Sequence, residues 1–223
     1  IIRVCPRWDC EMTPATPPSD IAFTPTVKAI QARKGSRDSY EQMERRGGWK
    51  TEIDEGLAEF IQAQRSFFFA TANAQGQPYI QHRGGPPGFL HVVDSRTLAM
   101  ADFRGNRQYI SQGNLEDNAR AFIFLIDYAR RQRVKVWGRA KMIEGDDDLA
   151  EKLMPPGYNA RAEQVLIFEV DAWDANCPQH IPQRFEAEDV AATLAERDRR
   201  IADLEAEIAE MRRVQKSCDK PQP

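Results

Sequence analysis

From Ser66 onward, apolar and polar residues alternate with a period of two over a series of short segments, and this pattern most constrains the fold. SFFFATA at 66–72 ends in the turn NAQG, and QPYIQHR follows at 77–83. Two such runs joined by a glycine-containing turn are typical of a β-hairpin. Further strand-like runs lie at 89–93, 97–102, 121–127, 133–144 and 164–172. About seven closely spaced antiparallel strands predict a mainly β fold, a small barrel rather than a βαβ sheet.

The segments on either side of these strands have helical patterns. Two short helices are expected over 26–32 and 36–46, before Gly47 and Gly48. A third, from Ile53 to Gln64, carries an apolar stripe and is predicted to dock on an apolar surface. The fold class expected is therefore a barrel with N-terminal helices and, as described next, a long C-terminal helix.

Residues 186–216 have a heptad pattern with dense charge and no Pro or Gly, which predicts one long helix. Arg197 interrupts the pattern. This seam is predicted to pack against its symmetry mate or another helix, as a coiled coil, and to serve assembly rather than a cofactor site. The apolar a and d positions are Leu194, Ile201, Leu204, Ile208 and Met211.

These patterns divide the chain into five expected parts. We interpret 1–11 as a tag or as upstream sequence, because Met12 resembles a natural start. The parts are a tag-like or flexible segment at 1–20, a helical segment at 21–65, the barrel at 66–185, the heptad helix at 186–216 and a flexible tail at 217–223.

Composition narrows the classes of partner. The chain has 34 acidic residues against 31 Lys and Arg, so no overall positive field favours nucleic acid or an anionic membrane. The longest strongly apolar run, 121–126, is far too short to cross a bilayer. Four scattered cysteines predict reduced thiols and a cytoplasmic location. Cys177 and His180 form a C-x-x-H pair without a second pair, so no metal site is expected.

Two turns that combine arginine with glycine are candidates for binding a phosphate. In HRGG at 82–85 a strand ends at Arg83 and runs into glycines, whose bare backbone lets an anion approach. In DFRGNRQY at 102–109 the chain turns at Gly105, and a short helix is expected to open at Asn106. QGN at 112–114 adds polar groups of the kind that hold the edge of a heterocycle. The alternatives are that the arginines form surface ion pairs and that the glycines only make turns.

The order of these motifs resembles the predicted flavin-nucleotide-binding branch of the pyridoxamine 5'-phosphate oxidase-like split barrels. The resemblance covers roughly residues 21–182. It is carried by Arg83, the GGPPG turn at 84–88, Gly105-Asn106-Arg107, Asn114 and Gly138-Arg139-Ala140.

The resemblance implies a homodimer of split barrels with FMN at the interface. The groups expected to hold the phosphate are the side chains of Arg83, Arg104 and Arg107 with the amides of Gly105 and Asn106, and Gly84 and Asp102 are also expected among the cofactor-binding residues. Those expected near the flavin ring are Gln81, His82 and Asn114, with Arg131, Arg133 and Trp137 reaching its other side. No catalytic side chain is identified.

The chain departs from true pyridoxamine 5'-phosphate oxidases where their C-terminal substrate-binding Arg-x-His segment would lie, because the heptad helix stands there. The resemblance therefore does not extend to vitamin B6 oxidation. The leading hypothesis is an FMN-dependent oxidoreductase that passes electrons or hydride to a small-molecule acceptor. A flavin carrier or sensor without turnover, and a purely structural module, are the alternatives. Related barrels also use a deazaflavin or heme, and the sequence leaves this choice open.

Overall fold

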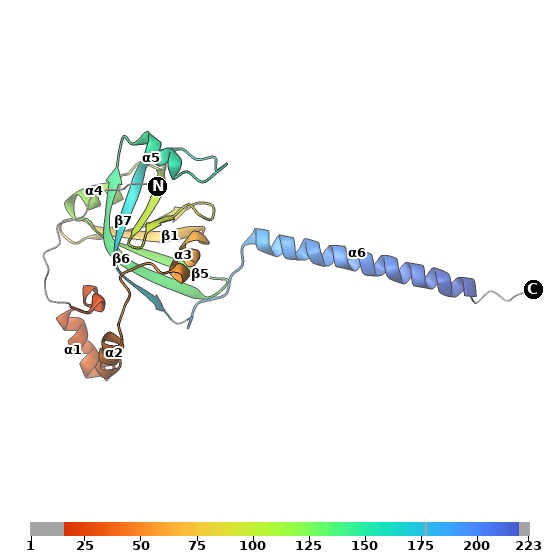
Figure 1. Cartoon of the computed structure of the whole chain (residues 1–223), viewed down its shortest axis with the longest axis horizontal. Helices are drawn as coiled ribbons and strands as arrows, with labels where there is room; N and C mark the ends of the chain where they lie inside the picture. The colour runs from red at the N-terminus through yellow and green to blue at the C-terminus, as the bar shows by residue number, and fades with distance from the viewer. Residues whose placement is uncertain (1–15, 177, 219–223) are drawn as a thin grey trace, which may run out of the picture. The chain divides into compact units, whose positions relative to one another are not determined.

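The computed structural model describes residues 16–176 and 178–218, and in them seven strands form one antiparallel sheet (Figure 1). The order across the sheet is β2-β1-β5-β6-β7-β4-β3. The strands are β1 Ser66–Ala72, β2 Pro78–Gly84, β3 His91–Asp94, β4 Thr97–Phe103, β5 Arg120–Asp127, β6 Gln132–Ile143 and β7 Ala162–Asn176. The predicted strands are thus confirmed.

Two long strands give the sheet its barrel form. β6 has 12 residues and β7 has 15, and β7 pairs with β6 along one edge and with β4 along the other. β2 and β3 are the two ends of the strand order, and no pairing joins them within the described residues. The sheet therefore does not close into a ring, and the chain has the predicted split β-barrel architecture.

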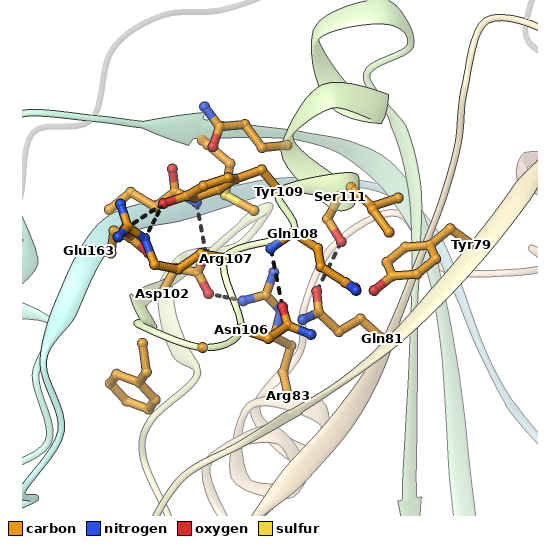
Figure 2. A pocket seen from close by; sticks show the side chains of 16 residues that line it. Tyr79, Gln81, Arg83, Asp102, Asn106, Arg107, Gln108, Tyr109, Ser111 and Glu163 are labelled. Atoms are coloured by element: carbon orange, nitrogen blue, oxygen red, sulfur yellow. Dashed lines mark hydrogen bonds and ion pairs between the residues drawn. The ribbon is translucent and has the colours of Figure 1, made fainter.

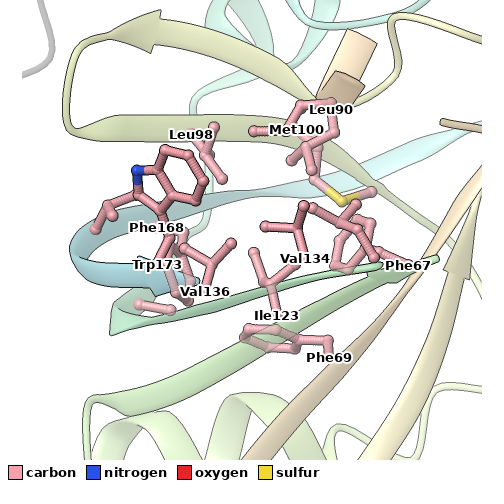
Figure 3. Close-up of a cluster of buried hydrophobic side chains, with 14 of the residues drawn as sticks. Phe67, Phe69, Leu90, Leu98, Met100, Ile123, Val134, Val136, Phe168 and Trp173 are labelled. Carbon is pink, nitrogen blue, oxygen red and sulfur yellow. The ribbon is translucent and has the colours of Figure 1, made fainter. Parts of the chain in front are cut away.

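Alternation along the strands builds the core (Figure 3). Phe67 and Phe69 of β1 are almost fully buried, as are Ile123 of β5 and Val136 of β6. β4 is buried on both faces, because its alternate face packs against α5 (Asp147–Lys152) in a second apolar cluster. The main core thus fills the inside of the curved sheet.

The short helix α3 (Glu55–Gln62) packs against this core, as its apolar stripe predicts. Its Leu57, Phe60 and Ile61 are buried in the main cluster. The helix begins after Asp54, whose carboxylate accepts a hydrogen bond of 2.8 Å from the backbone amide of Leu57 and so caps the first turn.

An aromatic stack attaches the N-terminal segment to the outside of the barrel. This segment contains η1 (Pro18–Ile21), α1 (Pro25–Lys34) and α2 (Arg37–Arg45). The Trp49 ring lies 5.1 Å from that of Phe23 and stacks on Trp137 of β6, with centroids 4.4 Å apart. Trp173 of β7 donates a 2.8 Å hydrogen bond to the carbonyl of Glu52.

Gly138 lies at a register shift in the pairing of β6 with β7, where there is no room for a side chain. The register between these strands shifts between Trp137 and Gly138. A Cβ atom at Gly138 would overlap the carbonyl oxygen of Glu169 and the ring of Phe168. The glycine of the G-R-A motif is therefore fixed by packing.

The described residues divide into two compact units. The first runs to Asp127 and from Gln132 to Gln179, and the second holds Tyr128–Arg131 and the residues from His180 onward. Within the second unit, Gln183 donates a 2.8 Å hydrogen bond to the carbonyl of Ala129. It also contains α6 (Ala187–Cys218), a 32-residue helix that confirms the predicted long C-terminal helix.

Some expectations fall outside the described residues: the origin of residues 1–11, the position of Cys177 and the last residues of the tail. Among the helices that are described, none combines the length and apolar character needed to cross a membrane.

Candidate cofactor-binding site

A polar pocket opens where the ends of β2, β4 and β7 meet the 104–109 loop and the start of α4 (Ile110–Asp117) (Figure 2). It combines two basic side chains, two acidic ones and several amides and hydroxyls. Its lining residues are Tyr79, Gln81, Arg83, Asp102, Phe103, Gly105, Asn106, Arg107, Gln108, Tyr109, Ile110, Ser111, Gln112, Met142, Glu163 and Gln164.

Strand alternation decides which side chains of β2 line this pocket. Tyr79, Gln81 and Arg83 are two residues apart and partly buried, and all three are lining residues. His82 belongs to the opposite, exposed face, where its ring packs edge-on against Phe68 at 5.8 Å.

Arg83 forms a nearly buried ion pair with Asp102, at the end of β4. The two side chains are 11% and 8% exposed. Gln164 of β7 donates a 2.9 Å hydrogen bond to the other carboxylate oxygen of Asp102. Asp102 is therefore held from both sides and fixes the position of the guanidinium.

One nitrogen of this guanidinium has no partner. Arg83 Nε is buried, and no hydrogen-bond acceptor is present for it among the described residues. Burial lowers the pKa of the Arg83 guanidinium from its ordinary value, although an arginine keeps its proton in proteins. A buried donor without an acceptor is costly to maintain, and because Arg83 lines the pocket, an acceptor supplied by a ligand there would relieve this cost.

The 104–109 loop holds a second arginine at the mouth of the pocket. Arg107 Nε donates a 2.7 Å hydrogen bond to the Tyr109 hydroxyl, which itself donates to Glu163 at 2.8 Å. Hydrogen bonding to Tyr109 raises the pKa of Arg107. Arg107 and Tyr109 have φ values of 60° and 53°, in the left-handed region that residues other than glycine rarely adopt. The loop thus presents Arg107 in a strained but well-bonded conformation.

The prediction that a helix opens at Asn106 is wrong, because α4 begins four residues later, at Ile110. Asn106 resembles a helix cap in sequence, but its side-chain oxygen accepts a 3.2 Å hydrogen bond from the amide of Gln108, inside the loop. The first turn of α4 instead contributes Ser111, whose hydroxyl donates to Gln81 Oε1 at 3.1 Å.

The glycine turn after β2 is closed by packing. The amide of Gly85 donates a 3.0 Å hydrogen bond to the carbonyl of Arg65. A Cβ atom at Gly85 would lie 2.7 Å from Phe89, which is fully buried. Gly84 precedes it at the end of β2, opposite Ser66. The Gly85 amide is therefore already used within the fold.

The structure brings six of the predicted site residues together in the pocket: Gln81, Arg83, Asp102, Gly105, Asn106 and Arg107. Four others have different surroundings. Arg104 is exposed and its amide bonds to the carbonyl of Arg161. Asn114 is buried and donates to Thr71 at 2.9 Å. The remaining two, His82 and Gly84, are described above.

The predicted residues of the β5–β6 region also lie outside the pocket lining. Trp137 is covered by Trp49 and contacts the Phe122 ring edge-on at 5.0 Å. Arg133 lies near the start of β6, with its backbone opposite Asn176. Arg131 occupies the preceding turn with a φ of 56°.

Several lining residues were not anticipated from the sequence. Tyr79 could have been found by period two, since it lies on the same face of β2 as Gln81 and Arg83. The sequence alone could not have identified Glu163 and Gln164, because only the pairing of β7 with β4 brings them beside Asp102.

Comparison with known proteins identifies the protein family to which the chain is related. A sequence profile of the family described as pyridoxamine 5'-phosphate oxidase matches residues 53–177, which is more than half of the chain. No curated protein sequence matches it.

Solved structures with similarity to the chain come from several bacteria. HupZ of Group A Streptococcus is 21% identical, covering 60% of this chain and 99% of its own, with a TM-score of 0.46. An FMN-binding protein of Syntrophomonas wolfei is 9% identical, covering 68% and 97%, with a TM-score of 0.45. HutZ, the heme storage protein of Vibrio cholerae, is 17% identical, covering 56% and 93%, with a TM-score of 0.37. The profile match, which runs from before α3 to the end of β7, shows that the chain belongs to the pyridoxamine 5'-phosphate oxidase family.

Proposed function

We propose that the pocket binds FMN and that the protein is an FMN-dependent oxidoreductase. The observation that carries this proposal is the buried Arg83, whose Nε lacks an acceptor at a pocket lined by polar side chains. Family membership makes a flavin phosphate a suitable acceptor for this donor.

Each arginine of the pocket is paired with a carboxylate, so a phosphate would be held by a few specific hydrogen-bond donors and not by an overall positive charge. Arg83 is paired with Asp102 and Arg107 with Glu163, so the lining is neutral as it stands. Arg107 is half-exposed and can exchange Glu163 for a phosphate oxygen, whereas Arg83 stays fixed by Asp102. Together with the loop backbone at Gly105, these groups would hold the phosphate through charge-assisted hydrogen bonds.

The other polar side chains of the lining suit a heterocycle with both donors and acceptors at its edge. Tyr79, Gln81, Ser111 and Gln112 offer hydroxyl and amide groups of both kinds. In this proposal they orient the flavin ring. Contacts from His82 and Asn114 to the flavin remain predictions, as do contacts from Arg131, Arg133 and Trp137, for which a second subunit is the expected source.

When bound, FMN would supply the electron or hydride transfer itself. The chain's residues then need only bind the cofactor, orient it and keep water from it. Asp102 has a positioning role in this proposal, because it holds the Arg83 guanidinium that would bind the phosphate.

We further propose that two copies of the chain form the complete site as a homodimer. Tyr109 and Ile110 at the pocket rim are 42% and 40% exposed, an arrangement that a second subunit would cover. Affinity for FMN would then depend on dimerisation. Light scattering that finds a monomer with fully bound flavin would contradict this arrangement. We also propose that the protein is located in the cytoplasm, as its cysteine content predicts.

Spectroscopy of freshly purified protein tests the cofactor class. We expect flavin absorbance bands and release of FMN, identified by mass spectrometry. A heme Soret band or a deazaflavin would overturn the assignment. In titrations of the apoprotein, FMN should bind much more tightly than riboflavin, because riboflavin lacks the phosphate. Equal affinities would contradict the role of Arg83 and Arg107.

A carrier or sensor without turnover is the second candidate, favoured by the exposed apolar seam of α6, which offers a surface for a partner. Stopped-flow oxidation of the reduced protein separates the two functions. Acceleration by a small-molecule acceptor supports the enzyme, and rates independent of every acceptor support the carrier.

A further inference from the structure

The helix α6 exposes an apolar seam that is interrupted by Arg197. The five apolar a and d residues from Leu194 onward are each between 39% and 57% exposed. At 1.5 Å per residue the 32-residue helix is about 48 Å long, and a helix of this length with an uncovered seam gains stability mainly by packing. The residues of the seam are Leu194, Ile201, Leu204, Ile208 and Met211.

We propose that this seam pairs with α6 of a second copy as a parallel, in-register, two-stranded coiled coil. In that geometry each g residue faces the e residue five positions later on the other helix. Arg200 at g would face Glu205 at e, and Glu207 at g would face Arg212 at e. Both pairs are attractive, and the twofold symmetry repeats each of them.

The antiparallel alternative has poorer charge complementarity. The antiparallel register that overlaps the whole seam places Ile201 opposite Leu204. It then sets e residues against e residues, so that Asp198 faces Glu205 with like charges, and g residues against g residues, so that Arg200 faces Glu207 with opposite charges. Each of these pairs occurs twice, so repulsion and attraction offset each other, whereas all the charged pairs of the parallel register are attractive. Charge pairing at e and g therefore favours the parallel orientation.

Two of these charged residues, Glu205 and Arg212, have no opposite charge three or four positions away on their own helix. The residues three and four positions from Glu205 are Ile201, Ala202, Ile208 and Ala209. Within one helix, charges stabilise each other at these spacings. Glu205 has no such neighbour, so a partner helix offers it the pairing that its own helix does not.

For Arg212 the corresponding neighbours are Ile208, Ala209, Gln215 and Lys216. None of them carries a negative charge, so Arg212 also depends on a second helix for an ion pair. The charged residues Glu205 and Arg212 at the e positions are therefore better placed for ion pairs between two helices than for ion pairs within one helix.

Arg197 at a d position fits the same arrangement. Two Arg197 side chains would meet at one layer, where a polar residue lowers stability but fixes the register. Asp198 of the other copy, at the adjoining e position, would offset their charge.

Cysteine cross-linking in the full-length protein tests the pairing directly. In a background with the four native cysteines replaced by serine, Leu204→Cys is compared with Ala206→Cys, which lies on the outward f position. Parallel in-register helices bring two copies of position 204 together, so mild oxidation should give a covalent dimer several-fold faster for L204C than for A206C. Equal rates, or a disulfide formed only between I201C and L204C chains, would overturn the proposal.

Charge exchange tests the orientation with the net charge kept constant. E205R/R212E, added to L204C, places like charges at every proposed pair and should slow cross-linking. Adding R200E/E207R to the same chain restores opposite charges and should restore the rate. Unchanged cross-linking in E205R/R212E, or no recovery in the combined variant, would show that these pairs do not form.

Discussion

The two arginine-glycine turns have similar sequences but differ in how they use their backbone. After β2, the amide of Gly85 donates a hydrogen bond to the carbonyl of Arg65, and Phe89 fills the position that a Cβ of Gly85 would occupy. In the 104–109 loop, nothing lies within 4 Å of the position that a Cβ of Gly105 would occupy. The first turn serves the core, and the second is open to a ligand.

The arginines of the two turns differ in the same way. Arg83 is nearly buried and paired with Asp102, whereas Arg107 is half-exposed and can exchange its partner. The comparison teaches that an arginine beside a glycine is not by itself a phosphate site. In the first turn the backbone is used by the fold and Arg83 keeps only its Nε for a ligand, whereas the second turn leaves both the backbone at Gly105 and the Arg107 side chain available.

The largest effect is expected from breaking the buried pair. Arg83→Met leaves Asp102 buried and uncompensated, which should lower the free energy of unfolding by about 3–5 kcal/mol. Chemical denaturation measures this change. The double variant R83M/D102N should recover much of the loss, because the amide carries no charge. If R83M were as stable as the parent protein, the pair would not be structural.

A smaller effect, confined to ligand binding, is expected at the second turn. Arg107→Met removes one charge-assisted hydrogen bond to the phosphate and should weaken FMN binding by about tenfold to a hundredfold. Its stability should change little, because Arg107 is half-exposed. Fluorescence titration with FMN, with riboflavin as the control ligand, checks this. A drop in riboflavin affinity of the same size would mean that Arg107 does not contact the phosphate.

The glycines provide a matched pair of substitutions. Gly85→Ala forces a methyl group against Phe89 and should destabilise the protein by about 1–3 kcal/mol. Gly105→Ala meets open space at an ordinary φ and should change stability by less than about 0.5 kcal/mol. Thermal melts of both variants measure the difference. Similar melting temperatures would remove the distinction between the two turns.

The smallest effect is expected from Arg104. Its side chain is exposed and absent from the pocket lining, while its amide, which the substitution preserves, bonds to Arg161. Arg104→Met should therefore alter FMN affinity by less than about 0.5 kcal/mol. A loss as large as that of R107M, in the same titration, would show that both arginines of the loop reach the phosphate.

The strands could be predicted from the sequence because alternation reports burial locally. The run at 133–144 alternates along its length, and β6 occupies Gln132–Ile143. The order of the strands is set by pairing between distant segments, which no local pattern reports. The start of α4 was misplaced because Asn106 stabilises a turn with the same side-chain chemistry that caps helices.

The candidate site was only partly predictable for a related reason. Arg83 and Arg107 could be named from their turns, but Gln164 reaches Asp102 only through the pairing of β4 with β7. Trp137 was expected near a flavin, and its cover by Trp49 could not be foreseen, since the two are far apart in sequence.

The stack of Trp49 on Trp137 also gives the molecule an optical property of its own. Two indoles with centroids 4.4 Å apart and planes 17° from parallel share their excited states. The coupling is strongest for the intense far-ultraviolet indole transition, so the circular dichroism in that region differs from the sum of two isolated chromophores. Because Trp49 precedes the barrel and Trp137 belongs to β6, the coupled spectrum exists only while the N-terminal segment is seated on that strand. Release of this segment from a folded sheet can thus be followed without any label.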